Sequence, residues 1–340
     1  MTTRSKTYLK YFFSALLTLL FLYLAFRGTD FAKLYEATRN ANYWWMAVMF
    51  GLLMVSHALR SWRWKYMLAP VKENIRFRNL FSGVMIGYFI NNVLPRAGEL
   101  ARPYTIGKLE SIPKSAAFGT IVIERMIDTV SFLLLVVLVP IVYHGPLRES
   151  FPWLANAGII ILCVTLVLLV VTVALMLRRD WTDAILSVAG KFLPVRFRRA
   201  LDGLAHSFLD GFLFLKQPGN FLIIFVLSFL VWFMYILMMY VSFCAFDLDG
   251  QLGLGDALVV QAISSIGVAM PTPGATGTYH MFTSQALVRL FRIPDEVALS
   301  FATVTHAVGY IGITVVGLYY FLQDHIKVSE AVGHVSEERE

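Results

Sequence analysis

Long apolar runs, interrupted by short basic segments, constrain the fold of this chain more than any other feature. An α-helix needs roughly 20 apolar residues to cross a ~30 Å hydrocarbon core. Runs that approach or exceed this length cover about residues 8–26, 43–60, 116–143, 154–177, 221–246 and 296–322. Backbone groups in lipid must be hydrogen-bonded within their own segment, so these runs predict six membrane-spanning helices.

The composition agrees with a membrane protein. The chain is 58% hydrophobic and only 15% charged, whereas soluble domains carry roughly 25% charged residues. The net charge of +7 lies mostly in short segments beside the apolar runs, so it reflects membrane orientation and does not indicate a nucleic-acid partner. The fold class predicted is an all-α polytopic membrane protein.

Two further regions, 79–112 and 254–292, are apolar but interrupted. Each holds two apolar stretches of about 12–17 residues, too short to cross the core comfortably, separated by a Pro/Gly turn. We therefore expect two re-entrant hairpins of broken helices. The predicted turn residues are Pro95 and Gly98 in the first region, and Pro271, Pro273, Gly274 and Gly277 in the second.

The two hairpin regions resemble each other. Setting Pro95 on Pro271 also places Gly98 on Gly274, and both regions lead through an Ile-Pro pair into a long span. The order of span, span, hairpin and span then occurs twice, as repeat one (about 8–143) and repeat two (about 154–322). Such a pattern predicts an inverted-topology repeat of the kind found in secondary transporters. The alternative is chance similarity in a chain rich in Leu, Val and Phe.

Loop charges predict the orientation. The segment 60–78 carries Arg60, Arg63, Lys65, Lys72, Arg76 and Arg78 against the single acid Glu73. The positive-inside rule places it in the cytoplasm, together with both termini. We expect residues 178–220 to form an amphipathic connector on the cytoplasmic leaflet, with an ordinary solvated connector as the alternative. The polar tail 325–340 is predicted to be disordered.

Charged residues recur where the membrane should be deepest. Arg96, Glu99 and Arg102 lie at the first hairpin tip, and the span 116–143 carries Glu124, Arg125 and Asp128. Insertion scales assign each such charge roughly 2.5–3.5 kcal/mol, so these residues need partners and are usually functional. Arg96 and Arg102 are the expected partners of Glu124 and Asp128. The alternative is an ion-pair network that only locks the hairpin to the span.

The second repeat contributes weaker candidates. Thr278 is the expected N-cap of the helix after the turn of the second hairpin. In the repeat, Thr305 and His306 occupy the positions that correspond to Glu124 and Arg125. In the first hairpin, a helix that restarts at Gly98 would direct its N-terminal N–H groups toward an anion. The predicted substrate-binding residues are Arg96, Glu99, Arg102, Glu124, Arg125, Asp128, Thr278 and His306.

Three motifs carry a resemblance to a known family. They are LPRAGELARPY at 94–104, IERMID at 123–128 and PTPGATG at 271–277. On these motifs the chain resembles the transmembrane region of lysylphosphatidylglycerol synthases. In bifunctional members that region is associated with flipping an aminoacylated lipid, which a separate soluble domain makes. The chain ends at Glu340, so we expect a stand-alone member without the synthase domain or its lysyl-transferase activity.

These observations predict a lipid translocase of a bacterial or archaeal cytoplasmic membrane, and not an enzyme. The expected cargo is a phospholipid or polyprenyl-linked lipid, with an anionic or phosphate-bearing headgroup. The alternatives are an intramembrane transferase acting on lipid-linked substrates and a non-transporting accessory subunit. We expect no cofactor, no metal and no nucleic-acid partner, because the sequence contains no nucleotide-binding or metal-ligand motif. Homo-oligomer formation stays open.

Overall fold

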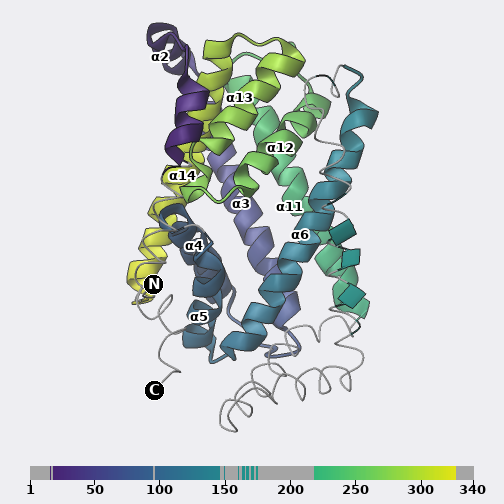
Figure 1. Cartoon of the computed structure of the whole chain (residues 1–340). Coiled ribbons are helices and arrows are strands. Elements are labelled where there is room, and N and C mark those ends of the chain that lie inside the picture. The colour runs from purple at the N-terminus through teal and green to yellow at the C-terminus, as the bar shows by residue number, and fades with distance from the viewer. Residues whose placement is uncertain are drawn as a thin grey trace, which may run out of the picture.

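The computed structural model describes residues 16, 18–94, 96–145 and 218–326, with isolated positions between 149 and 174. Throughout this part the regular structure is helical (Figure 1). The helices are α2 (Phe31–Asn40), α3 (Tyr43–Leu68), α4 (Phe77–Val93), α5 (Gly98–Glu110), α6 (Lys114–Val142), α11 (Pro218–Ala245), α12 (Leu254–Ala269), α13 (Thr278–Phe291) and α14 (Asp295–Gln323). A 3₁₀ turn, η2 (Pro273–Ala275), precedes α13.

Three of the predicted spans are confirmed. Helices α6, α11 and α14 are long and apolar enough to cross a membrane, and they cover the runs at 116–143, 221–246 and 296–322 within a few residues. Large apolar side chains on their outer faces, such as Leu134, Phe225 and Val315, are exposed, as expected for surfaces that face lipid. The chain is therefore a multi-pass membrane protein.

The boundary predicted at residue 60 is wrong. Helix α3 continues to Leu68, because Pro70 is the first residue after Gly51 that disfavours a helix. With 26 residues it is about 39 Å long. Arg60 and Arg63, assigned above to a cytoplasmic loop, therefore lie within the helix.

Several predictions fall on other parts of the chain. Of the first run, residues 18–26 are helical. Most of the run at 154–177, most of the connector at 178–220, the tail beyond Ile326 and the turn residue Pro95 lie outside the described residues. These assignments stay predictions.

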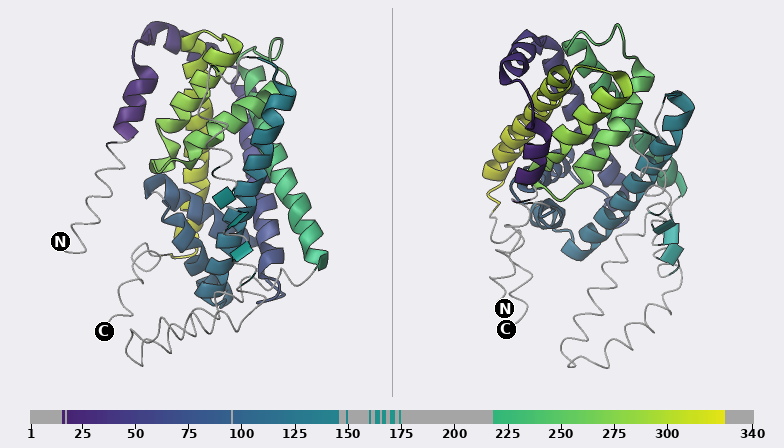
Figure 2. Two further views of the ribbon diagram at one scale, coloured as in Figure 1. Left: turned by 45° about the vertical axis from the view of Figure 1, so that its right-hand side comes forward. Right: turned by 45° about the horizontal axis from the view of Figure 1, so that its top comes forward.

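Both interrupted regions are pairs of helices, as predicted. Helices α4 and α5 form one hairpin, and α12 and α13 form the other. Figures 1 and 2 show the two hairpins at opposite ends of the molecule, with their turns directed toward its middle. We call these ends the α5 end and the α13 end.

Glycine allows each pair of helices to approach closely. A Cβ atom on Gly98 would lie 1.9 Å from the carbonyl oxygen of Gly87, and one on Gly267 would lie 2.7 Å from that of Thr278. Both distances are well inside van der Waals contact, so each hairpin is held at a spacing that only glycine permits.

Two apolar cores hold the hairpins against the spans. One core joins α12 and α13 to α6, α11 and α14, with Val139, Phe243 and Phe301 fully buried in it. The other joins α4 and α5 to α3 and α6, and includes Trp64, Leu80 and Ile106. Helix α3 packs beside α11, α4 packs against α14 and α12 packs against α6.

A short helix, α2, was not expected. Asp30 caps its N-terminus by accepting hydrogen bonds from the N–H groups of Ala32 (2.9 Å) and Lys33 (3.3 Å). The side chain of Thr38 in α2 contacts Ser300 of α14 at 2.8 Å. Figure 1 shows α2 at the α13 end.

At the α5 end, the last turn of α14 is fastened to the first hairpin. Asp324 pairs with Arg78 at 2.5 Å and accepts a hydrogen bond from Ser82, both on α4. Lys108 of α5 donates to the carbonyl oxygen of His325 at 2.7 Å. We call this set of contacts the α14 clasp.

Candidate functional site

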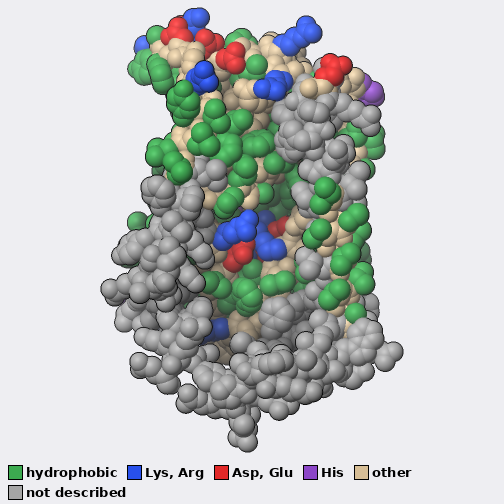
Figure 3. Space-filling view, in the orientation of Figure 1, with side chains coloured by type: hydrophobic (Ala, Val, Ile, Leu, Met, Phe, Trp, Pro, Cys, Tyr) green, Lys and Arg blue, Asp and Glu red, His purple; other side chains and the backbone are tan. Residues whose placement is uncertain are grey.

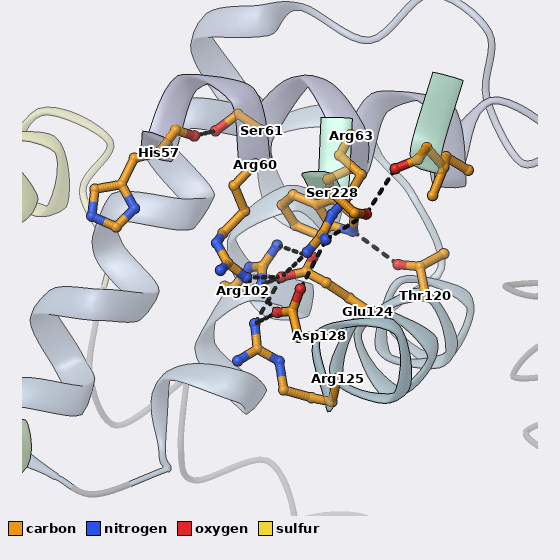
Figure 4. Close-up of polar contacts among 12 residues, drawn as sticks. His57, Arg60, Ser61, Arg63, Arg102, Thr120, Glu124, Arg125, Asp128 and Ser228 are labelled. Atoms are coloured by element: carbon orange, nitrogen blue, oxygen red, sulfur yellow. Dashed lines mark hydrogen bonds and ion pairs between the residues drawn. The ribbon is translucent and has the colours of Figure 1, made fainter. Parts of the chain in front are cut away.

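Six charged side chains from three helices meet in the interior of the molecule. They are Arg60 and Arg63 from α3, Arg102 from α5, and Glu124, Arg125 and Asp128 from α6. Figure 4 shows the four guanidinium groups converging on the two carboxylates. We call this set the arginine cluster.

Helical periodicity places these side chains. Arg60 and Arg63 are three residues apart on α3, and Glu124 and Asp128 are four apart on α6, so each pair shares one helix face. Glu124 is ten residues from the start of α6, or about 15 Å along a helix that rises 1.5 Å per residue. The cluster therefore lies well inside the membrane-spanning part of α6.

Of the two acids, Glu124 has more arginine partners. Its side chain is 0% exposed. Arg102 binds it through both terminal nitrogens, at 3.0 Å to Oε1 and 2.9 Å to Oε2. Arg60 and Arg125 each donate to Oε1 at 2.8 Å. Arginines from three helices, α3, α5 and α6, therefore bind this one carboxylate.

Asp128 pairs with three of the arginines that also contact Glu124, since Arg63 Nη2 lies 3.5 Å from Glu124 Oε1. Arg60 donates to its Oδ2 at 2.8 Å, and Arg63 Nη1 lies 2.8 Å from Oδ1. Arg125 is 3.3 Å from Oδ2. Arg60 therefore bridges the two acids, since its Nη1 reaches both Glu124 and Asp128.

Neutral side chains complete the surroundings. From α11, Tyr235 accepts a hydrogen bond from Arg60 and Ser228 accepts one from Arg63, each at 2.9 Å. The guanidinium carbon of Arg102 lies 4.4 Å from the ring centroid of Trp64, within the range of a cation–π contact. These contacts fix the orientations of the guanidinium groups.

The arginine cluster carries more positive than negative charge. Four guanidinium groups face two carboxylates, which leaves an excess of two positive charges. Several buried donors in it lack a hydrogen-bond partner in the described part of the chain, namely the Nε atoms of Arg60, Arg63, Arg102 and Arg125 and Nη2 of Arg63. Asp128 Oδ1 also lacks a hydrogen bond, although it lies 2.8 Å from Arg63 Nη1. Every arginine of the cluster is paired with an acid, so it is the net positive charge that favours an added anion.

The cluster is accessible from one side. The Arg125 side chain is 40% exposed and that of Asp128 is 13% exposed, whereas Arg63 and Glu124 are 0% exposed. Figure 3 shows basic and acidic side chains in a hollow about half way up this face, with apolar side chains above and below. An approaching group would therefore reach Arg125 first.

Of the six charged site residues predicted in the first repeat, four come together and two do not. Arg102, Glu124, Arg125 and Asp128 belong to the arginine cluster, and the expected pair of Arg102 with Glu124 is present. Arg96 is exposed and Glu99 is half-buried, and neither forms an ion pair with any described residue. Asp128 pairs with the arginines of α3 in place of Arg96 or Arg102, because α3 extends further than predicted.

Four residues that complete the site were not predicted. Arg60 and Arg63 were assigned to a loop, and Ser228 and Tyr235 lie in a run read only as a span. The spacing of the two arginines in a stretch without Gly or Pro would have favoured a longer α3. For Ser228 and Tyr235, positions seven residues apart on one helix face offer only a weak signal.

The residues predicted in the second repeat form a separate group. The expected N-cap role of Thr278 is wrong: Gly277 precedes the helix, and Thr278, the first helical residue, contacts Thr272 at 3.0 Å. His306 Nε2 lies 2.8 Å from the carbonyl oxygen of Gly274, and its ring lies 4.7 Å from that of His280. No hydrogen bond or ion pair between described residues links this group to the arginine cluster.

Helix α5 begins at Gly98, as expected. The Gly98 N–H group, however, already donates to Asn91 at 2.7 Å, so this donor is not available to an anion. Among the described residues, no group of three or more His, Cys, Asp or Glu side chains is arranged to hold a metal ion. The guanidinium groups are therefore the main source of attraction for a ligand.

Comparisons with known proteins agree with a membrane family. The family model described as the lysylphosphatidylglycerol synthase TM region matches residues 11–317. A UPF0104 membrane protein of Methanothermobacter thermautotrophicus is 30% identical over 257 residues, which cover 71% of this chain and 74% of that protein. A UPF0104 membrane protein of Methanocaldococcus jannaschii is 37% identical over 113 residues, 32% of this chain and 33% of that relative.

A longer relative carries an enzyme's name. The chain is 23% identical to the glycosyltransferase AglD of Haloferax volcanii over 352 aligned positions. The match covers 96% of this chain but only 56% of AglD. No solved structure matches the chain.

Proposed function

Because the chain belongs to the lysylphosphatidylglycerol synthase transmembrane-region family, we propose that it is a lipid translocase. It moves a phospholipid or polyprenyl-linked lipid between leaflets and binds the phosphate-bearing headgroup at the arginine cluster. The observation that carries this proposal is the excess of positive charge inside a membrane-spanning bundle, beside a hollow on the face that meets lipid. A headgroup in this hollow keeps its tails in the bilayer.

The two hairpins at opposite ends of the molecule belong to the two repeats that would move during transport. We take the chain to be an inverted-topology repeat with six spans and both termini in the cytoplasm, and the α5 end to face the cytoplasm. Arg76, Arg78, Lys72 and Lys108 at that end support the orientation. Rocking of one repeat against the other would then expose a fixed central site to each leaflet in turn.

An intramembrane transferase is the second candidate, favoured by the glycosyltransferase name of AglD. A transferase of this kind needs a general base near the lipid. Glu124 is buried and accepts hydrogen bonds from three guanidinium groups, and Asp128 is paired with three arginines. Carboxylates held in this way are weak proton acceptors, so translocation fits the geometry better.

The proposal is tested in liposomes that contain only the purified chain. A fluorescent phospholipid with an anionic headgroup is placed in one leaflet, and its arrival in the other is followed with a membrane-impermeant quencher. We expect transfer without chemical change of the lipid, and a loss of at least tenfold in Arg102→Gln. The matched control is Arg289→Gln, which removes the same charge from an exposed position on α13.

Each outcome separates the candidates. Transfer of unaltered lipid supports a translocase, and a change in lipid mass on chromatography supports a transferase. A chain that binds lipid but neither moves nor modifies it is an accessory subunit. Transfer by Arg102→Gln at the parental rate would mean that the arginine cluster is structural.

A further inference from the structure

The charge balance of the arginine cluster points to a specific class of headgroup. Four guanidinium groups are always charged, and two buried carboxylates balance half of them. The hairpin tip adds one residue of each sign, Arg96 and Glu99, so it does not change this balance. The ligand that leaves no net charge in the low-dielectric interior therefore carries two negative charges.

The free donors support the same conclusion. The unpartnered donors are contributed by arginines of α3, α5 and α6. The guanidinium groups lie around the carboxylates on several sides (Figure 4), and Arg125 is the most exposed of them. A phosphomonoester has three terminal oxygens and a charge of about −1.5 to −2 at pH 7, which matches the excess charge of the cluster. A phosphodiester has two free oxygens and a single charge, and a zwitterionic headgroup would add a cation to a site that already has two in excess.

We propose that the arginine cluster binds a lipid whose headgroup is a dianionic phosphate, and that it discriminates against monoanionic phosphodiesters and zwitterionic lipids. This inference rests on the proposed function, because it names the cargo of the same site. The dianion can be a terminal phosphomonoester or a diphosphate linked to a further group, since both carry about two charges. Selectivity arises from the charge balance, and not from contacts to the lipid tails.

Binding to lipids with identical tails tests the proposal. Phosphatidic acid supplies the monoester, phosphatidylglycerol the monoanionic diester and phosphatidylcholine the zwitterion, and a diphosphate lipid with the same tails supplies the other dianion. Affinity for the purified protein is measured in detergent at pH 7.5 by thermal shift and by competition. We expect the two dianionic lipids to bind at least tenfold more tightly than phosphatidylglycerol, and phosphatidylcholine to bind most weakly.

Charge variants at the open side of the cluster sharpen the test. Arg125→Gln leaves an excess of one positive charge and should reduce the preference for phosphatidic acid over phosphatidylglycerol at least fivefold. Asp128→Asn raises the excess to three and should strengthen the preference. Arg125 is 40% and Asp128 13% exposed, and thermal unfolding of each purified variant checks that it is folded before its lipid preference is compared. Arg289→Gln, which removes an exposed charge on α13, should leave the preference unchanged.

The results also separate this inference from the proposed function. If phosphatidylglycerol binds as tightly as the dianionic lipids or more tightly, the proposed selectivity for a dianionic headgroup is wrong, even where lipid transfer occurs in liposomes. A preference for dianionic lipids without transfer supports the headgroup class and rejects translocation. Protection from thermal unfolding by inorganic phosphate alone, with no added effect of lipid phosphate, would identify free phosphate as the ligand and overturn the lipid assignment.

Discussion

Glu124 accepts hydrogen bonds from arginines on α3, α5 and α6, and its side chain is fully buried. No other described carboxylate joins three helices in this way. It therefore serves two purposes, because it ties the first hairpin to two spans and also limits the positive charge of the arginine cluster. Loss of its charge should affect stability as well as binding.

We expect Glu124→Gln to lower the free energy of unfolding by about 3–5 kcal/mol, the range seen when one partner of a buried ion pair is removed. The reason is that Arg60 and Arg102 would stay buried with one carboxylate fewer. Thermal unfolding of the purified protein in detergent measures the change. Glu36→Gln, at an exposed position on α2, is the control, and equal stability of the two variants would contradict the prediction.

A second carboxylate, Glu110 at the α5 end, should make stability depend on pH. Burial raises the pKa of Glu110, but hydrogen bonds from Lys72, Asn79 and the backbone N–H of Arg76 outweigh it, so the pKa lies below its ordinary value of 4.5. The folded state therefore binds this proton more weakly than the unfolded state. The stabilisation is complete above pH 4.5 and is lost as the pH falls through the lowered folded-state pKa.

The comparison of Glu110→Gln with the parent chain checks this. The variant should be less stable at pH 7 and should lose less stability between pH 5 and pH 3 than the parent does. Parallel stability curves for the two proteins over that range would show that Glu110 is not the group responsible.

The sequence predicted much of the arginine cluster but only part of its pairing, since Arg102 pairs with Glu124 as expected whereas Asp128 pairs with Arg60 and Arg63. Glu124, Arg125 and Asp128 were recognisable because charges in an apolar run are expensive. Arg60 and Arg63 were not, because basic residues at the end of a run ordinarily mark a loop. Which arginine meets which carboxylate depends on how α3 and α5 pack against α6, and no local pattern encodes that.

Among the elements, the hairpins have the most demanding geometry. Gly98 begins α5 where its backbone meets that of Gly87 in α4, and Gly267 plays a similar part in the second hairpin. Close approach of two backbones leaves no room for a methyl group. The turns were predictable from Pro and Gly, whereas these contacts required the structure.

Gly98→Ala should therefore force α4 and α5 apart, with a loss of roughly 1–3 kcal/mol in unfolding free energy, as is typical of overpacking. It should also displace Arg102, which lies one turn further along α5, and so reduce lipid transfer. Gly51→Ala is the matched control, since nothing lies within 4 Å of its Cβ position on α3. In a helix interior that change should leave stability equal or up to about 1 kcal/mol higher. Similar losses for both variants would argue against the close contact.

Element boundaries followed the apolar runs where those runs were uninterrupted, as in α6, α11 and α14. Those runs did not indicate α2, because its ten residues are too few to cross a membrane. Local signals do indicate this helix, since Asp30 is a favoured N-cap residue and Phe31, Leu34 and Tyr35 share one helix face.

For the molecule as a whole, the α14 clasp bears on the proposed movement. Asp324 and the carbonyl of His325 fasten the end of α14 to both helices of the first hairpin. On the proposed inverted repeat, α14 belongs to the second repeat and α4 and α5 to the first, so the clasp joins the two repeats at the α5 end. Alternation between leaflets would require it to open.

Cross-linking tests that requirement. In a background without Cys163 and Cys244, a reducible thiol cross-linker that joins Arg78→Cys to Asp324→Cys should stop lipid transfer, and reduction should restore it. Ser264→Cys with Thr283→Cys is the control pair, because these residues touch at 2.7 Å within one hairpin and should cross-link without effect. Unchanged transfer in the cross-linked clasp would exclude opening at this end.

The orientation of the two hairpins is tested by labelling in sealed cells. Lys108 lies at the end of α5 and Arg292 follows α13, at opposite ends of the molecule (Figure 1). Single cysteines at the two positions should react with an impermeant thiol reagent from opposite sides, with Arg292→Cys reacting from outside. Labelling of both from one side would reject the inverted repeat.

On the proposed mechanism, the two excess positive charges of the arginine cluster also make translocation depend on membrane voltage. A charge that crosses the whole transmembrane field changes in energy by about 2.3 kcal/mol per 100 mV. The site stays central, but opening it to one side brings it close to the potential of that side. A bound dianion cancels the excess charge, whereas without bound lipid two positive charges respond to the potential. An inside-negative voltage then favours the cytoplasm-facing state of the lipid-free protein, and so biases the leaflet from which the lipid is collected.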